Sequence, residues 1–546
     1  MIATPFPNQP PPYEGCNLYA SDVALGDAVG HHDAAWAAAQ LAAWGATLGA
    51  PETWALADAA NRNAPTLRSF DPGGERIDEV AFHPAWHDLM RLATASGEHC
   101  APWRSPRSGA QVARAAMYYL HAQVENGTQC PLTMTYASIP VLARHAGELP
   151  QVADLWLPRV MALDYDPRVL PVDAKRSALI GMGMTERQGG SDVRANITHA
   201  APDGDGAWRV SGHKWFFSAP QCDAHLVLAQ TSAGLGCFLM PRVRPDGTRN
   251  AIRILRLKDK LGNRSNASSE VEFADALAWP IGAAGRGIAT ILEMVQYTRL
   301  DCVIGSAGIV RAAAARALHH ARHRTTFGRR LVDHPLMAHV LADLALESEA
   351  ALWLALGLAH ACEADADAPT RAAARIVTPA AKYWVCKRAI AATAEAMEAL
   401  GGNGYVEENP LPRFYREAPV NSIWEGSGNI VCLDVARATR KEPDAVDALL
   451  AALAQAGGAN AAFDRHCAAL EGALRCADDD PAANRRIAQA VALAVAAAAL
   501  IRHAPDFVAD AYCASRLASD GYAGAAFGTL PSGVATRRIL ERALAD

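Results

Sequence analysis

Apolar residues recur at intervals of three and four between about Asp33 and Ile180, as in AAWAAAQLAAWGATLG and GAQVARAAMYYLHAQVENG. This spacing places them on one face of an α-helix. Proline and glycine interrupt the pattern repeatedly, so we expect several helices in this region. The residues before it are rich in proline and predict an arm rather than a helix.

The pattern changes at Gly181. Up to about Gly282, the chain contains short alternating strings such as WRVSGHKWFFS, HLVLAQT and IRILRL, and glycine, aspartate and asparagine separate them. These features predict an antiparallel β domain. Helical spacing returns at about Gly285 and continues to Lys441, and Pro443 marks a boundary before an alanine-rich helical remainder.

Helices, strands and helices thus follow one another in blocks, which indicates an α+β fold rather than alternating βαβ units. We predict an N-terminal helical domain with a proline-rich arm (1–180), a central β domain (181–284), a helical bundle (285–442) and an extra helical C-terminal domain (443–546).

Composition narrows the class of protein. Hydrophobic residues make up 51% of the chain and charged residues 20%, and the net charge is -6, which is typical of a globular protein and not of a nucleic-acid or anionic-membrane protein. The 12 cysteines form no C-x-x-C pair, so we expect reduced thiols and no zinc ribbon. The start lacks a secretory signal, and the apolar stretch at residues 487–501 is shorter than the ~20 residues of a membrane span. We expect a buried helix there and a cytoplasmic protein.

A glycine-rich string, GMGMTERQGGSDV, occupies residues 181–193. Small residues allow close approach of a ligand, Thr185 and Ser191 offer hydroxyls, and exposed N–H groups can hold a pyrophosphate. The alternative is an ordinary loop before a strand, and no helix follows to complete a dinucleotide-binding fingerprint.

Three consecutive aromatics, Trp215, Phe216 and Phe217, follow in GHKWFFS. Neighbouring strand residues point to opposite faces, so both faces must be covered. A planar cofactor would satisfy this requirement on one face, and helices on both faces would satisfy it equally well.

A lone carboxylate, Glu425, lies in NSIWEGSGNI between Trp424 and a Gly-x-Gly bend. An apolar pocket raises the pKa of a carboxylate toward the range needed for proton abstraction. A solvated loop glutamate is the alternative.

Basic residues near position 320 offer two further candidates. Arg324 in HRTTFGRR is suited to a phosphate or, with Gly328 near the C′ position, to a helix C-cap. His319, His320 and His323 have helical spacing but no acidic or cysteine partner nearby in sequence, so we predict no metal site.

Together, MTERQGGSDV, KWFFS, HRTTFGRRLVDHP, LGGNGY and WEGSGNI resemble the acyl-CoA dehydrogenase family in order and spacing, over about residues 180–440. KDKLGNRSNAS, MPRVRPDGTRNAIR, the CNLYASDVAL start and the C-terminal extension resemble its AidB-type branch, which is associated with the response to DNA alkylation. This resemblance covers nearly the whole chain. It implies a helical N-terminal domain, a central β-barrel-like domain, a C-terminal four-helix bundle, FAD as cofactor and a homotetramer.

Carried over by motif, the resemblance implies Glu425 as catalytic base. It further implies that Arg324 reaches the FAD pyrophosphate of a neighbouring subunit. The implied cofactor-binding residues are Met182, Gly183, Met184, Thr185, Gln188, Gly189, Gly190, Ser191, Trp215, Phe216, Phe217, Ser218, Arg324, Phe327, Ile423, Trp424, Gly426, Ser427, Gly428, Asn429 and Leu433.

Two positions bear on this assignment. Isovaleryl-type members carry their base directly before a helix arginine, where this chain has Thr298 before Arg299, which favours Glu425. The family usually has glutamine three residues before its Gly-Gly turn, where this chain has Glu398, whose charge would repel a pyrophosphate.

The predicted activity is FAD-dependent dehydrogenation of an acyl-CoA, with isovaleryl-CoA as a candidate substrate. Glu425 would remove the α-proton while the β-hydride passes to flavin N5. The alternative is a protein that protects duplex DNA and has weak or vestigial dehydrogenase activity, and a structural scaffold is a third option. Residues 444–546 hold nine arginines against twelve acidic residues, so DNA would require a local stripe. The candidates are Arg437, Arg440, Lys441, Arg485, Arg486, Arg537 and Arg538.

Overall fold

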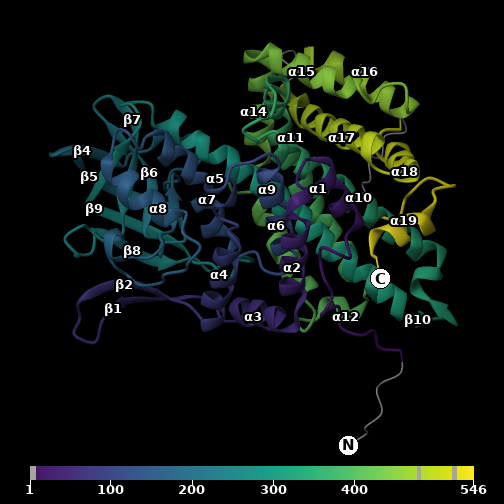
Figure 1. Ribbon diagram of the computed structural model, residues 1–546, viewed down its shortest axis with the longest axis horizontal. Coiled ribbons are helices and arrows are strands. Elements are labelled where there is room, and N and C mark those ends of the chain that lie inside the picture. Colours follow the sequence, from purple (N-terminus) through teal and green to yellow (C-terminus); the bar gives the residue numbers. More distant parts are fainter. Residues whose placement is uncertain (1–7, 476–480, 519–525, 546) are drawn as a thin grey trace, which may run out of the picture. The chain divides into compact units, whose positions relative to one another are not determined.

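The computed structural model describes residues 8–475, 481–518 and 526–545 (Figure 1). The chain divides into two compact units, each assembled from separate stretches of sequence. One unit comprises Met1–Trp54, Arg107–Val124 and Arg299–Asp546, and we call it the helical unit. The other comprises Ala55–Pro106 and Glu125–Thr298, and we call it the sheet unit.

A seven-stranded sheet dominates the sheet unit, in the order β3-β6-β4-β5-β9-β7, with β8 beside β9. An additional pairing of β6 with β7 closes this order into a barrel. Most pairs are antiparallel, as predicted, whereas β3 and β4 each pair with β6 in parallel. The strands are β3 (Ile180–Gly183), β4 (His199–Gly204), β5 (Ala207–Ser218), β6 (Ala224–Thr231), β7 (Gly234–Pro241), β8 (Ile252–Leu257) and β9 (Ser268–Ile281).

The apolar positions of these strings form the barrel core. Val210, Phe217, Val227, Phe238 and Val271 are each at most 1% exposed and belong to one apolar cluster. The buried residues of β5 are Val210, Lys214 and Phe217, and the strand has register shifts between Val210 and Gly212 and, beside the aromatic run, between Lys214 and Phe217. Burial of these side chains stabilises the barrel by about 1.5–3 kcal/mol for each large apolar residue.

The rest of the sheet unit is mainly helical. It contains α4 (Pro84–Ser96), α5 (Ala101–Arg104), α7 (Gln129–Arg144) and α8 (Leu157–Val160), and α9 (Gly287–His323) begins in it. A hairpin of β1 (Thr66–Phe70) and β2 (Arg76–Ala81) also lies here, where we predicted only helices. Its strands alternate exposed and half-buried positions, and Arg76 donates to the carbonyl of Ile254, so contacts distant in sequence support it.

Long helices form the core of the helical unit. Its α11 packs against α13, α14, α15 and α17, and α10 packs against α1, α6, α17 and α19. The helices are α1 (Val23–His31), α2 (Ala38–Gly49), α6 (Ala110–Ala122), the rest of α9, α10 (Pro335–His360), α11 (Ala368–Ala399), α12 (Gly402–Tyr405), α13 (Leu411–Asn421), α14 (Gly428–Lys441), α15 (Pro443–Ala454), α16 (Ala461–Arg475), α17 (Asn484–His503), α18 (Asp506–Arg516) and α19 (Thr536–Ala543), while α3 (Pro51–Arg62) spans the unit boundary.

Buried ion pairs join distant parts of the helical unit. Arg114 and Asp301, each 1% exposed at the side chain, form a bidentate pair between α6 and α9. Arg516 of α18 contacts Asp343 and Glu347 of α10. Since a buried charge that loses its partner costs about 3–5 kcal/mol, these pairs determine how the helices dock.

The apolar stretch at residues 487–501 lies within α17, as predicted. The segment Pro481–His503 is long and apolar enough to cross a membrane by length and composition, and 56% of its most apolar window is buried. The helix packs against α10, α11, α14 and α16, which accounts for its alanine-rich surface: small side chains let helices approach closely.

Candidate functional site

The glycine-rich string of the sheet unit begins on β3 and continues as a loop that one buried carboxylate anchors. Glu186 is fully buried, and Lys214 of β5 donates to it at 2.8 Å. Gln188 and the backbone N–H of Ile197 also donate to Glu186. Burial raises the pKa of Glu186, but the hydrogen bonds and charge of Lys214 outweigh this effect and lower it to about 2.

Small residues fit two positions of this string, Gly183 and Gly190. A Cβ added at Gly183 would lie 2.7 Å from the ring of Phe217, and one at Gly190 would lie 2.3 Å from the hydroxyl of Thr185. The loop and β5 are also joined through their backbones, because the N–H of Trp215 donates to the carbonyl of Thr185 at 2.9 Å. The structure therefore brings the first two predicted motifs together.

The aromatic run separates across the strand. Phe217 is fully buried in the barrel and stacks on His225 with ring centroids 4.0 Å apart, whereas Phe216 is 53% exposed. Trp215 is half-buried, and the ammonium of Lys258 lies 4.2 Å from its ring and 4.3 Å from that of Phe216. The strand thus presents an exposed aromatic ring on one face and a packed core on the other.

These residues fit a flavin. In the described part of the chain, no hydrogen bond engages the side-chain hydroxyls of Thr185, Ser191 or Ser218. Gln188, Gly189, Gly190 and Ser191 are exposed, and the exposed ring of Phe216 offers an apolar surface for a planar group. Free donors, a small-residue loop and an aromatic surface are the groups that a pyrophosphate and an isoalloxazine require.

Glu425 belongs to the helical unit, in the turn between α13 and α14. It has a φ of 60°, and Gly426 a φ of 103°. A left-handed conformation costs a non-glycine residue about 1–2 kcal/mol, so other contacts must hold it. The indole N–H of Trp424 donates to the side chain of Asn421 at 3.1 Å, which closes the turn on the end of α13.

Two cationic side chains hold this turn, and neither was predicted from the sequence as a site residue. Arg299 of α9 donates to the carbonyl of Glu425 at 2.9 Å and to Asp434 of α14 at 2.6 Å. Lys382 of α11 donates to the carbonyls of Asn421 and Gly426. Their local sequences contain no hint of this role, since the carbonyls they contact lie about 40 or more positions away.

The remaining residues of the predicted segment 423–433 form the start of α14. Ser427 is the N-cap, and Asn429 accepts a hydrogen bond from Arg485 of α17 at 2.8 Å. Ile423 is 62% and Leu433 50% exposed, so both are available to a ligand or a second chain.

Arg324 lies directly after α9 and contacts the N-terminal arm. Its guanidinium donates to the carbonyl of Asn8 at 2.7 Å, and the side chain of Asn8 bonds both the N–H and the carbonyl of Thr325. The alternative placement of Gly328 as a helix C-cap is wrong: α9 ends at His323, and Gly328 follows Phe327 in the turn between β10 (Thr325–Thr326) and β11 (Arg329–Arg330). Both turn residues have positive φ, which this tight hairpin requires.

The three histidines of the α9 end differ in their surroundings. The imidazoles of His319 and His323 are 4.4 Å apart, and each bonds a backbone carbonyl, of Pro11 and His319 respectively. Burial lowers the pKa of His320 to about 4. Across the described residues, no group of three or more histidines, cysteines or carboxylates is arranged to hold a metal ion.

Candidate DNA-binding cations lie on α14, α17 and α19, and several are engaged. Arg437 pairs with Asp434, Arg537 pairs with Glu541, and Arg538 lies over the ring of Phe507. Arg485 donates to Asn429, and the remaining candidates are Arg440, Lys441 and Arg486.

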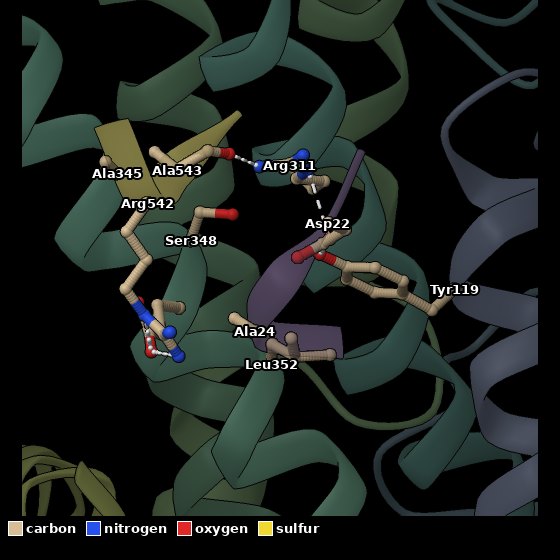
Figure 2. Close-up of a pocket in the computed structure, with 10 residues that line it drawn as sticks. Asp22, Ala24, Tyr119, Arg311, Ala345, Ser348, Leu352, Arg542 and Ala543 are labelled. Atoms are coloured by element: carbon tan, nitrogen blue, oxygen red, sulfur yellow. Dashed lines mark hydrogen bonds and ion pairs between the residues drawn. The ribbon is translucent and has the colours of Figure 1, made fainter. Parts of the chain in front are cut away.

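A small cavity in the helical unit is separate from all of these residues. It has a volume of about 10 Å³, enough for about one water molecule, and Asp22, Tyr119, Arg311 and Arg542 are among its lining residues (Figure 2). Arg311 pairs with Asp22, and Tyr119 donates to the same carboxylate. None of the predicted site residues lines this cavity.

Comparison with known proteins identifies the family of the chain. Residues 8–167 match the N-terminal domain of the adaptive response protein AidB, 181–276 the middle domain of acyl-CoA dehydrogenases and 285–439 their C-terminal domain. The chain is 49% identical to the AidB protein of Escherichia coli (strain K12), whose name places it among acyl-CoA dehydrogenases, over 94% of both chains. It is 29% identical to acyl-CoA dehydrogenase family member 11 of Caenorhabditis elegans, over 68% of this chain and 62% of that one.

Solved structures are similar over the same span. ACDH-11 of Caenorhabditis elegans, in complex with C11-CoA, has a TM-score of 0.83 at 25% identity and covers 94% of this chain and 92% of its own. The apo-form of Bd2924 has a TM-score of 0.80 at 29% identity, covering 91% and 99%. The matched domains, the relatives and the shared fold show that the chain belongs to the acyl-CoA dehydrogenase family of FAD-dependent oxidoreductases, and within it to the AidB-like members.

Proposed function

We propose that this protein oxidises an acyl-CoA at the bond between its α and β carbons, with Glu425 as the base that removes the α-proton. The observation that carries this proposal is the turn around Glu425. A strained left-handed glutamate, held through its own carbonyl by Arg299, is a residue whose position the fold controls. Strain of this kind concentrates at functional sites.

The alternative position for a base supports the same assignment. Thr298 is buried on α9 and donates its hydroxyl to the carbonyl of Val295 at 3.1 Å. Threonine has no carboxylate, so position 298 cannot supply the base in place of Glu425.

FAD would be held by the loop from Met184 to Ser191 together with Phe216 and Ser218, and when bound it supplies the acceptor for the β-hydride. The protein's own contribution is to bind the thioester, orient its α-proton toward Glu425 and exclude water. Positioned general bases typically accelerate proton transfer about 10²–10⁴-fold.

The test is anaerobic reduction of the bound flavin by acyl-CoA, followed by absorbance. Glu425→Gln should keep FAD and lose the bleaching rate by about 10²–10⁴-fold, since an amide cannot accept the proton. Glu541→Gln is the matched control, because Glu541 is 61% exposed on α19 and pairs only with Arg537 among the described residues. Bleaching by Glu425→Gln at the wild-type rate would contradict the assignment.

The acyl chain should be tested in the same experiment. C11-CoA is bound by the similar ACDH-11 structure, and isovaleryl-CoA represents short branched substrates. We propose that whichever compound bleaches the wild-type flavin faster defines the substrate class.

Duplex-DNA binding remains the alternative function. The structure contains no observation that favours it over dehydrogenation, because several of the candidate arginines already have partners within the chain. If the wild-type protein holds FAD but neither acyl-CoA bleaches it, DNA binding is the better supported function.

A further inference from the structure

We infer that Lys382 is a positioning residue for the reaction: its ammonium group fixes the turn that carries Glu425. This inference rests on the proposed function, because it assigns a role relative to Glu425 as base. Lys382 lies in the middle of α11, far in sequence from the turn, and is 1% exposed.

The contacts of Lys382 explain why a charged residue is buried there. Its Nζ donates to the carbonyl of Asn421 at 3.0 Å and to that of Gly426 at 2.9 Å. Among the described residues, no carboxylate forms an ion pair with it. A buried ammonium is costly, so a site that retains one without an anionic partner must use its donors.

The two carbonyls lie on either side of Glu425. Asn421 is the last residue of α13, where the helix dipole favours a cation, and Gly426 directly follows the base. One ammonium therefore joins the rigid helix end to the strained turn. Arg299 adds a third point by binding the carbonyl of Glu425 itself.

Lys382 and Glu425 both act electrostatically on one buried thiol. The thiol of Cys302 on α9 is buried, and burial raises its pKa, while the charge of Lys382 lowers it and that of Glu425 raises it. Both charged groups therefore act on the same buried thiol. In general, a cation near a carboxylate favours the ionised form of that carboxylate.

The first experiment compares flavin reduction in the purified holoenzyme with Lys382→Met, which keeps the length of the side chain but removes its donors and charge. We expect the limiting rate of reduction to fall by about 10²-fold, because small displacements of a catalytic group have effects of this size. Acyl-CoA affinity should change little, and the acidic limb of the pH–rate profile should move to higher pH. Lys382→Arg, which keeps the charge and donors, should recover most of the rate.

A double-mutant comparison separates positioning from general damage. In the Glu425→Gln background, Lys382→Met should cause little further loss, because the group it positions is already gone. A full additional loss, or an unmoved pH profile, would overturn the inference. If the flavin of the Glu425→Gln variant is reduced at the normal rate, the proposed role of Glu425 is wrong. That outcome is distinct from one that contradicts only the role of Lys382.

A measurement that does not depend on catalysis completes the test. Amide hydrogen exchange of peptides covering residues 422–428 should be faster in Lys382→Met than in wild type, with little change over α16. Unchanged exchange in the turn would overturn the inference even in an active enzyme. Lys382→Gln, which keeps a donor, replaces the methionine variant if that variant does not fold, with the same expected shift of the pH profile.

Discussion

Individual buried charges do much of the positioning in this protein. Lys214 and Glu186 are both fully buried, and their pair joins the glycine-rich loop to β5. The ammonium also donates to the carbonyl of Leu228, so it connects the loop to β6 as well. Such a pair contributes little net stability compared with apolar residues, but it determines a unique loop position.

The first consequence concerns stability when one partner is removed. Lys214→Met should destabilise the protein by about 3–5 kcal/mol, because it leaves Glu186 buried and unpaired. Lys214→Met combined with Glu186→Leu should recover part of that loss. Chemical denaturation measures both, and a double variant as unstable as the single one would contradict the pairing.

The same ion pair predicts how the stability of the protein changes with pH. The pKa of Glu186 is lowered to about 2 from an ordinary value of 4.5. Its contribution to stability is therefore fully present above pH 4.5 and is lost as the pH falls from there toward 2. The double variant lacks this group and should lose less stability over that range.

At the scale of elements, several helices end on histidines that meet. Helices α1, α10 and α17 end at His31, His360 and His503. The rings of His31 and His503 are 3.7 Å apart, those of His32 and His360 are 5.0 Å apart, and Trp353 stacks on His503. A helix end favours a cation, yet burial lowers the pKa values of His31, His32 and His503 and so favours their neutral forms.

This arrangement predicts acid sensitivity in the docking of α17. Burial lowers the pKa of His32 to about 3 and that of His503 to about 4, and the charges of neighbouring histidines and Arg502 add to this effect. Burial also lowers the pKa of His31, where Asp33 has the opposite effect. The neutral histidines therefore make their full contribution to stability above the ordinary histidine pKa of 6.5. This contribution is lost as the pH falls toward 4. In thermal melts, His503→Phe should keep the stacking and show a shallower fall of Tm between these values. An identical slope would show that the cluster does not titrate as expected.

At the scale of the whole molecule, three large apolar side chains of the helical unit are strongly exposed. Phe327 is 97%, Leu336 86% and Tyr405 81% exposed, and all belong to the helical unit. Single exposed apolar residues are common, and a contact between subunits is one environment that would bury such large side chains. We propose the homotetramer of the family as the assembly that covers them.

Light scattering during gel filtration tests this proposal. Phe327→Ser combined with Leu336→Ser should reduce the tetramer to smaller species, because it removes apolar area from the contact. Phe70→Ser is the control, since Phe70 is 56% exposed on the hairpin of the sheet unit and has no assigned role in assembly. A wild-type monomer, or a tetramer that survives the double substitution, would contradict the proposal.

By itself, the sequence determined two kinds of feature: side-chain spacing that repeats along an element, and motifs that lie within a few residues. Helical and alternating spacing located the helical regions and the β domain, because side-chain periodicity follows directly from backbone geometry. The motif residues around Thr185, Trp215 and Glu425 identified the family for the same reason: chemistry that needs a loop or turn keeps it within a few residues. The hairpin of β1 and β2 could not be predicted in this way, since partners distant in sequence support it.

Only the tertiary structure decided which distant groups hold those motifs in place. Lys382 and Arg299 reach the Glu425 turn from other helices, and Lys214 reaches Glu186 across the barrel. A lysine in an amphipathic helix has the same local pattern whether its ammonium meets water or a buried carbonyl. Packing, which depends on every element at once, selects between these outcomes, and for this reason the positioning residues could not be predicted from spacing alone.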